Sequence, residues 1–341
     1  MSKCAICGKR NANKTNSHIV PSFLIAMVAS ADSSYKRDKE ILYSITENHI
    51  KPYIGRNTNI SDIERNFSEL SDTELEEMRA NNAAKDYIFC SQCEKALGDY
   101  LESPYATTFK ENKIIKPEKS YFFWLSVLWR MNEFDSTRNK LNNFLANKLG
   151  KSLSQYIESK IKGVDIKHIF PFKYKLLYCK DYCRDNAGMI HLQYDRRFKI
   201  ASGFFGDFVI CFLFQGRSIP KSYSFYGLER LFRKAAINDG TLEEQRLDIS
   251  VEDLTKAYSR FIEAKQLSLF EGEKEKILRL WSAARNKGMN IPISPNGAFI
   301  QQCLQLLHDD KIKVGDRCGY RYFAECFDKA YYMTYGVRLT I

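Results

Sequence analysis

The chain of 341 residues lacks the long hydrophobic run that a transmembrane helix requires. Its longest strongly apolar stretch, residues 204–214, is interrupted by Gly206 and Asp207 and is too short to cross a bilayer as a helix. A signal peptide is also missing, because Met1 leads directly into a motif that begins at Cys4. We therefore expect a cytoplasmic protein that has no membrane partner.

Several common catalytic motifs are absent as well. The sequence contains no Gly-x-x-x-x-Gly-Lys-Ser/Thr phosphate loop, no Gly-x-Gly-x-x-Gly dinucleotide fingerprint and no Gly-x-Ser-x-Gly nucleophile elbow. Internal repeats and low-complexity tracts are missing too. Any energy-dependent regulation would thus have to come from a regulatory partner protein, such as an ATPase or a sensor.

The composition is that of a folded, basic protein. Apolar residues make up 44% of the chain, including 23 Phe and 20 Tyr, which is sufficient for the cores of two ordinary domains. The net charge of +11 favours a polyanionic partner, either nucleic acid or an acidic membrane surface. Surplus lysine is also common in proteins that have no such partner.

Cysteine pairs stand out in this setting. Cys4 and Cys7 form one Cys-x-x-Cys pair, and Cys90 and Cys93 form a second. In a reducing compartment such pairs favour metal binding over disulfides, and four thiolates from two tight turns close a tetrahedral zinc site. The alternative is that the four thiols are unrelated, since 82 residues separate the pairs. Loop closure does not exclude the site, because its cost grows slowly with length.

A histidine lies between the two pairs, in the segment Ser17-His18-Ile19-Val20-Pro21, and Glu94 directly follows the last cysteine. This arrangement, over residues 1–105, resembles the HNH (His-Me finger) endonucleases that have a zinc-ribbon clamp. The resemblance implies a ββα module in which His18 is the general base for phosphodiester hydrolysis and a catalytic Mg²⁺ or Mn²⁺ stabilises the leaving group. It also implies a prokaryotic restriction or anti-phage defence effector that acts on nucleic acid, DNA rather than RNA.

The sequence departs from the family pattern at supporting positions. Ser17 replaces the acidic metal ligand that often precedes the histidine, and Glu94 replaces an Asn or His. We expect Glu94 to take the role of divalent-ion ligand, because a carboxylate is a good ligand for such ions. The middle Asn of the family has only Asn81 and Asn82 as candidates, and Glu102 is interpreted as a surface residue. The alternative function is therefore a catalytically inactive, zinc-dependent scaffold that binds nucleic acid or a protein.

Residues 160–180 form a lysine-rich segment near the middle of the chain. Its positions alternate with aromatic residues, which favours a strand with one basic face, and such a face suits phosphate contacts and base stacking. The alternative is an amphipathic strand whose aromatics belong to the core. The candidate nucleic-acid-binding residues are Lys160, Lys162, Lys167, Lys173 and Lys175.

Periodicity predicts the remaining elements. Residues 61–79 form an acidic helical stretch, 121–150 a long helix, 190–195 an alternating strand and 204–214 a buried strand, and helices dominate from Ser250. The predicted fold class is α+β. A zinc-stapled HNH-like module occupies residues 1–110 with a helical insertion at about 30–80, and a mostly helical domain with a small antiparallel sheet at about 165–215 occupies 111–341.

Overall fold

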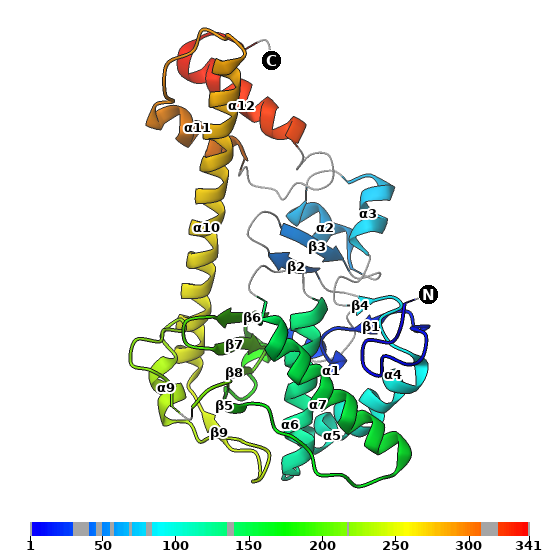
Figure 1. The fold of residues 1–341 in the computed structure, drawn as a ribbon. Coiled ribbons are helices and arrows are strands. Elements are labelled where there is room, and N and C mark those ends of the chain that lie inside the picture. Colours follow the sequence, from blue (N-terminus) through cyan, green and yellow to red (C-terminus); the bar gives the residue numbers. More distant parts are fainter. Residues whose placement is uncertain are drawn as a thin grey trace. The chain divides into compact units, whose positions relative to one another are not determined.

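The computed structural model describes residues 2–29, 41–45, 50–54, 58–67, 70–79, 84–134, 140–216, 218–307 and 320–339 (Figure 1). The chain forms two compact units. The first is Met1–Arg37 with Asn81–Ser259, and the second is Asp38–Ala80 with Arg260–Ile341. The division differs from the predicted boundary near residue 110, which falls inside the first unit.

The first unit begins with short elements around the two cysteine pairs. Strand β1 (Ser17–His18) pairs antiparallel with β4 (Ala84–Lys85), in the register Ser17 to Lys85 and His18 to Ala84. Helix α1 (Ser22–Ala29) follows β1 and begins directly after Pro21, whose fixed φ suits the start of a helix. After β4 a nearly continuous helical segment comprises α4 (Ser91–Leu97), a π-helix (Gly98–Glu102) and α5 (Ser103–Lys110).

The predicted helix over residues 121–150 is two helices, α6 (Pro117–Phe134) and α7 (Asn143–Lys162). Asn142 explains the new start, because its side chain accepts a hydrogen bond of 2.9 Å from Leu145 N and caps α7. Helix α6 is buried on nearly every face from Ser120 to Asn132. A helix with apolar residues all round belongs in the centre of a core.

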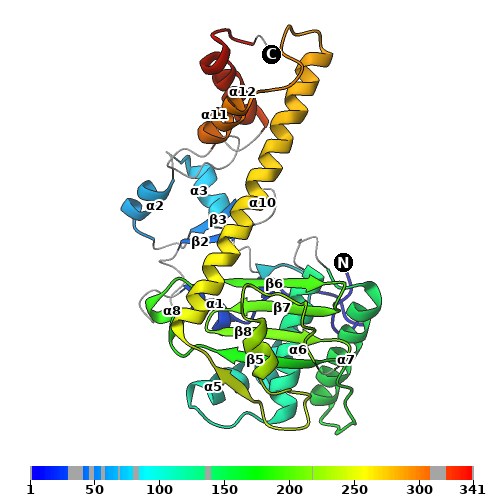
Figure 2. The ribbon, with the colours of Figure 1, turned by 90° about the vertical axis from the view of Figure 1, so that its left-hand side faces the viewer.

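A five-stranded sheet packs against α6, in the order β6-β7-β8-β5-β9. Figure 2 shows β6, β7, β8 and β5 side by side, and Trp124 of α6 contacts the rings of Phe205 and Phe208. The first four strands are antiparallel and β9 runs parallel to β5, so the sheet is mixed rather than purely antiparallel. The strands are β5 (Lys173–Tyr178), β6 (Ile190–Asp195), β7 (Ile200–Phe205), β8 (Phe208–Leu213) and β9 (Arg246–Asp248).

The apolar run 204–214 was predicted to be one buried strand. The structure shows instead that it contains the end of β7, a turn and the whole of β8, which together belong to a hairpin. Gly206 and Asp207 connect β7 to β8, and Gly206 has a φ of 64°. A glycine takes this left-handed conformation without the strain that a side chain would cause. The run seems continuous in sequence only because β7 and β8 are both buried along their whole lengths. Two short helices complete this unit, α8 (Tyr182–Asp185) and α9 (Glu229–Lys234).

The second unit contains the insertion between the cysteine pairs. The predicted helical insertion is in part a hairpin, in which β2 (Ile41–Ile45) pairs with β3 (Ile50–Ile54). The predicted helical stretch 61–79 is two short helices, α2 (Ile60–Asn66) and α3 (Asp72–Met78). A capping box between Ser71 and Glu74 starts α3.

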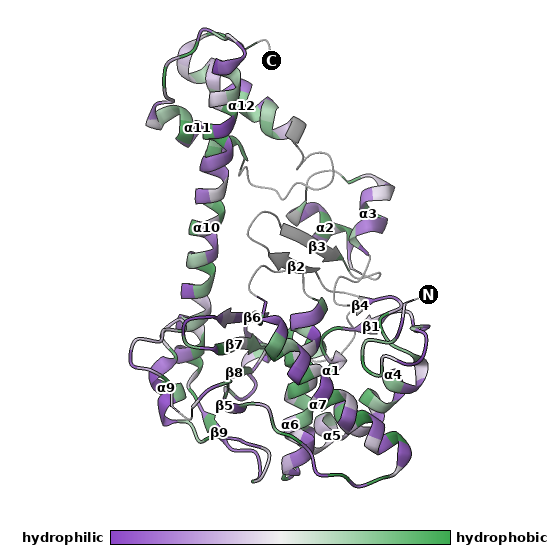
Figure 3. Cartoon of the chain, viewed as in Figure 1, coloured by the Kyte–Doolittle hydropathy of each residue, from purple (hydrophilic) through white to green (hydrophobic). Residues whose placement is uncertain are grey.

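The C-terminal part is helical, as predicted. Helix α10 (Val251–Asn286) spans the boundary between the units, and Figure 3 shows bands of hydrophilic and hydrophobic residues along it. Helices α11 (Gly297–Leu307) and α12 (Tyr320–Tyr335) follow, and their buried side chains surround Trp281 of α10. Over the ranges that the structure describes, none of the helices has the length and apolar character that crossing a membrane requires.

Candidate functional site

The four predicted zinc ligands lie together in the first unit. The sulfur atoms of Cys4, Cys7, Cys90 and Cys93 are all within 4.8 Å of one another, and all four residues are buried. Tetrahedral zinc with Zn–S bonds of about 2.3 Å needs sulfurs about 3.8 Å apart, so a small contraction of the cluster suffices. These residues could therefore hold a structural metal such as zinc. The two pairs lie together in the fold although 82 residues separate them in the sequence.

Local turns explain how the cluster forms. Gly8 N donates to Cys4 O at 2.8 Å, and Gly8 has a φ of 63°, which closes the first knuckle tightly. The second pair stands at the start of α4, where Cys90 is the N-cap residue. Asn13 connects the two, since its Oδ1 accepts a hydrogen bond of 2.9 Å from Ser91 N.

Arg10 adds a positive charge beside the thiols. Its Nε donates to Cys90 Sγ at 3.1 Å, and its Nη2 donates to Cys93 Sγ at 3.2 Å. Four thiolates around one Zn²⁺ leave a net charge of about −2, and hydrogen bonds from such neighbours stabilise it. A hydrogen bond with the Cys93 thiol lowers the pKa of Cys4 to about 4, and the same contact raises the pKa of Cys93. Sequence analysis missed Arg10.

His18 ends strand β1 and is partly exposed, whereas its neighbour Ser17 is fully buried. The carbonyl oxygen of His18 accepts a hydrogen bond of 2.9 Å from Arg130 Nη1, which fixes this end of the strand. Arg130 comes from the buried helix α6 and has only 2% of its surface exposed. The His18 segment is thus attached to the core of the unit through one guanidinium group.

Glu94 lies near the same strand, one residue after Cys93 in α4. Burial raises the pKa of the Glu94 carboxyl, while the nearby Ser17 hydroxyl and the Arg130 charge oppose this change. Glu94 Oε2 and Ser17 Oγ are both buried, and within the described part of the chain neither meets the geometry of a full hydrogen bond, although the Ser17 hydroxyl lies close enough to act on the Glu94 carboxyl. Buried oxygens without full hydrogen bonds are costly, so these two atoms are the least satisfied polar groups beside His18.

Glu102 is not the simple surface residue that the sequence predicted. Its carboxylate forms an ion pair of 2.7 Å with Arg130 Nη1, and its side chain is only 21% exposed. It is the last residue of the π-helix, a form that often marks a functional position in a helix. The guanidinium of Arg130 thus links the carboxylate of Glu102 to the main chain at His18, and its charge acts on Glu94.

Arg130 was missed because sequence reasoning assigned its helix to the core. The available signal was a single basic residue inside an otherwise apolar run, Trp129-Arg130-Met131. Such a residue is buried only when paired, so it predicts an acidic partner elsewhere. Asn81 and Asn82, the candidates for the middle Asn of the family, lie outside the described residues.

The five candidate lysines do not share one strand. Lys160 and Lys162 belong to the last turn of α7, Lys167 lies in the following loop, and only Lys173 and Lys175 are in β5. Lys162 and Lys167 are exposed. These two positions are the most accessible for contact with a phosphate backbone.

Other lysines of this set are engaged within the protein. Lys160 forms an ion pair of 2.9 Å with Glu118. Lys175 is buried, and its ammonium donates to Ala235 O at 2.7 Å and to Arg233 O at 3.2 Å. Burial also lowers the pKa of Lys175. An ammonium group enclosed by main-chain carbonyls cannot reach a phosphate, so the assignment of Lys175 to a nucleic-acid face is wrong.

Comparisons of the chain with protein-family models, with curated proteins and with solved structures found no match. The site is therefore interpreted from its own geometry.

Proposed function

We propose that the protein is a metal-dependent endonuclease that hydrolyses phosphodiester bonds of nucleic acid, with His18 as general base. One observation carries this proposal. The strand that ends in His18 and the helix that carries Glu94 lie together beside a four-cysteine cluster, and the buried oxygens Glu94 Oε2 and Ser17 Oγ lie near each other without a full hydrogen bond in the described structure. A metal at the cysteines would hold this arrangement without taking part in catalysis, since four sulfurs leave no open position.

The residues have distinct roles in the proposed reaction. The imidazole of His18 accepts a proton from the attacking water, because histidine titrates near neutral pH. Glu94 supplies a carboxylate for a divalent cation, and Arg130 positions His18 by holding its carbonyl oxygen. The cation, when bound, would supply charge stabilisation for the phosphate and the leaving 3′ oxygen.

The proposed substrate is DNA rather than RNA, and the proposed setting is anti-phage defence in the cytoplasm. The net charge of +11 supports a polyanionic substrate, and exposed Lys162 and Lys167 offer phosphate contacts. Reducing conditions there would keep the cysteines available for zinc. A regulatory partner such as an ATPase or sensor would supply the activating signal.

A cleavage assay tests the proposal directly. Plasmid, single-stranded DNA and RNA are incubated with wild-type protein and Mg²⁺, Mn²⁺ or chelator. We expect metal-dependent cleavage that His18→Ala lowers by roughly 10²–10⁴-fold, the usual contribution of a general base. Glu94→Gln should lower the rate and be partly rescued by excess Mn²⁺, while the exposed control Glu111→Gln should retain full activity. Zinc content should match the wild type in all three, and unchanged cleavage in His18→Ala would remove the assignment.

A specific observation favours the second candidate, a non-catalytic zinc-dependent scaffold for nucleic acid or protein. The buried Arg130 guanidinium already provides a fixed positive charge to Glu102 and acts on Glu94. A protein that has replaced its divalent cation by an arginine would need no metal at this position. If wild-type protein binds nucleic acid but cleaves none of the three substrates under any metal condition, the scaffold is the correct function.

A further inference from the structure

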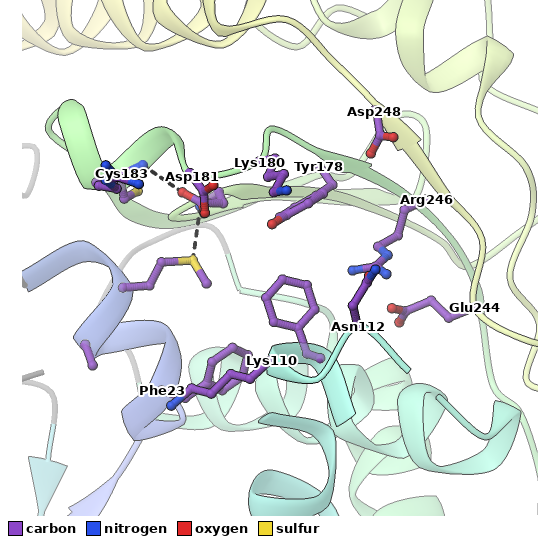
Figure 4. Close-up of a pocket in the computed structure, with 15 residues that line it drawn as sticks. Phe23, Lys110, Asn112, Tyr178, Lys180, Asp181, Cys183, Glu244, Arg246 and Asp248 are labelled. Atoms are coloured by element: carbon purple, nitrogen blue, oxygen red, sulfur yellow. Dashed lines mark hydrogen bonds between the residues drawn. The ribbon is translucent and has the colours of Figure 1, made fainter. Parts of the chain in front are cut away.

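A second, separate site lies elsewhere in the first unit. A cavity of about 750 Å³ is lined by residues of α1, α5, α8, β5, β9 and the turn between β7 and β8 (Figure 4). This volume falls within the range of about 300–1,000 Å³ that is usual for small-molecule sites. Neither His18, Glu94 nor any of the four clustered cysteines belongs to the lining.

Arg246 of β9 lines one side of this cavity. Its guanidinium carbon lies 5.1 Å from the ring centroid of Phe109 and 5.3 Å from that of Tyr178, and Figure 4 shows it pointing into the open space. In the described part of the chain, its N–H groups make no hydrogen bond and no ion pair. A planar cation held against two aromatic rings, with its donors available, is a surface on which a heteroaromatic base stacks.

Glu244 forms the fixed wall behind Arg246. Its carboxylate accepts hydrogen bonds from Tyr105 Oη at 3.0 Å, Trp124 Nε1 at 3.0 Å and Tyr174 Oη at 3.2 Å. These three donors are fully buried side chains of the core. Because its oxygens are already engaged, Glu244 is part of the cavity wall rather than a contact for a ligand. The cavity wall is thus built in advance around the arginine.

Charged side chains at the opening suit the rest of a nucleotide. Lys180 and Arg184 are exposed cations on the segment that follows β5, and they suit phosphate oxygens. Asp181 and Asp248 are exposed carboxylates that suit the hydroxyl groups of a ribose. An apolar ligand would leave all of these groups desolvated, and an inorganic anion would make no use of the stacking face.

We propose that this cavity binds a nucleoside phosphate, whose base stacks against Arg246 and whose phosphates pair with Lys180 and Arg184. The same chemistry is presented by a free nucleotide and by the end of a single-stranded nucleic acid. The site is independent of the proposed nuclease centre, because the two share no residue.

Titration calorimetry on the full chain tests the proposal. The probes are ATP, GTP, adenosine, inorganic phosphate and a ten-residue single-stranded DNA. We expect binding of at least one nucleotide that exceeds the binding of adenosine and of phosphate by tenfold or more, since each of these presents only half of the ligand. Tighter binding of the DNA than of ATP and GTP assigns the nucleic-acid end as the source, and the reverse order assigns the free nucleotide.

Variants make the result specific to the cavity. Arg246→Met should weaken nucleotide binding by at least tenfold, whereas Arg279→Met, at an exposed position of α10, should have no effect. Lys180→Gln, at an exposed position, serves as a second variant that avoids disturbing the core. His18→Ala should bind nucleotide as the wild type does, which separates this site from the proposed nuclease. No binding by any nucleotide at millimolar concentration, phosphate binding as tight as ATP, or unchanged binding in both cavity variants would overturn the proposal.

Discussion

Arg130 and Glu102 form an ion pair of 2.7 Å in which the arginine is buried and the glutamate is largely covered. The same guanidinium also donates to the carbonyl oxygen of His18 and to Ser126 O, at 2.9 and 3.2 Å. One side chain of α6 thus connects the π-helix with strand β1. The position of the His18 main chain is therefore tied to the same guanidinium that pairs with Glu102.

Arg130→Met should destabilise the protein by about 3–5 kcal/mol, because it removes one partner of a buried ion pair. The free energy of unfolding is measured by urea titration with zinc present. Glu102→Gln should lower the free energy of unfolding less in the Arg130→Met variant than in the wild type, because Glu102 has already lost its ion-pair partner in that variant. Arg279→Met, which breaks an exposed pair with Glu275, should have no measurable effect. A loss below about 1 kcal/mol for Arg130→Met would show that the pair is unimportant.

Purified wild-type protein should contain about one equivalent of tightly bound zinc, and Cys90→Ser should lose it together with the folded N-terminal part. The metal is quantified by mass spectrometry, and unfolding is followed by circular dichroism. Cys326→Ser removes a buried thiol outside the cluster and should keep the zinc. Less than half an equivalent in the wild type would contradict a zinc site.

Arg10→Met should weaken zinc binding by roughly 10–100-fold, the usual effect of losing a group that hydrogen-bonds to metal ligands. The reason is the loss of its two N–H···S bonds to Cys90 and Cys93. Competition with a chromogenic chelator measures the affinity. Lys9→Met, at the adjacent exposed position, is the matched control. Equal affinities in the wild type and Arg10→Met would mean that the guanidinium does not stabilise the thiolates.

The salt dependence of nucleic-acid binding should distinguish lysines that contact phosphates from a lysine that is buried. If Lys162, Lys167 and Lys173 contact phosphates, replacing all three with Gln should make the slope of log K against log salt shallower by about 2–3. Lys175→Met should leave that slope unchanged and alter stability instead, since Lys175 is buried against carbonyl groups. Fluorescence anisotropy with labelled DNA over a range of salt concentrations gives both slopes. The same slope in the triple variant and the wild type would show a purely solvated surface.

Glu244 should make stability fall with rising pH. Burial raises the pKa of this carboxyl, so above about pH 4.3 the unfolded chain loses the proton more readily than the folded one. Glu244→Gln should therefore gain in melting temperature relative to the wild type as the pH rises above about 4.3. Glu243→Gln, at the exposed neighbour, should show no such trend. A relative gain for the wild type at the higher pH would mean that its hydrogen bonds and Arg246 outweigh burial.

Local patterns predicted the elements that depend on neighbours in sequence. The alternating strand at residues 190–195 and the helix that starts after Ser250 were confirmed. The four cysteines were also grouped correctly, and the structure brings them within 4.8 Å of one another. Periodicity, proline and capping residues act over a few positions, so a sequence shows them directly.

Only the tertiary structure decided which polar residues are buried and what they contact. Lys173 and Lys175 occupy alternate positions of one strand. The carbonyl oxygens of Ala235 and Arg233 accept hydrogen bonds from the Lys175 ammonium. Arg130 lies in a helix that periodicity assigns to the core, and its partners are separated from it by 28 and 112 positions in the chain (130 − 102 and 130 − 18). Burial depends on what packs opposite a side chain, and that partner comes from a distant part of the sequence.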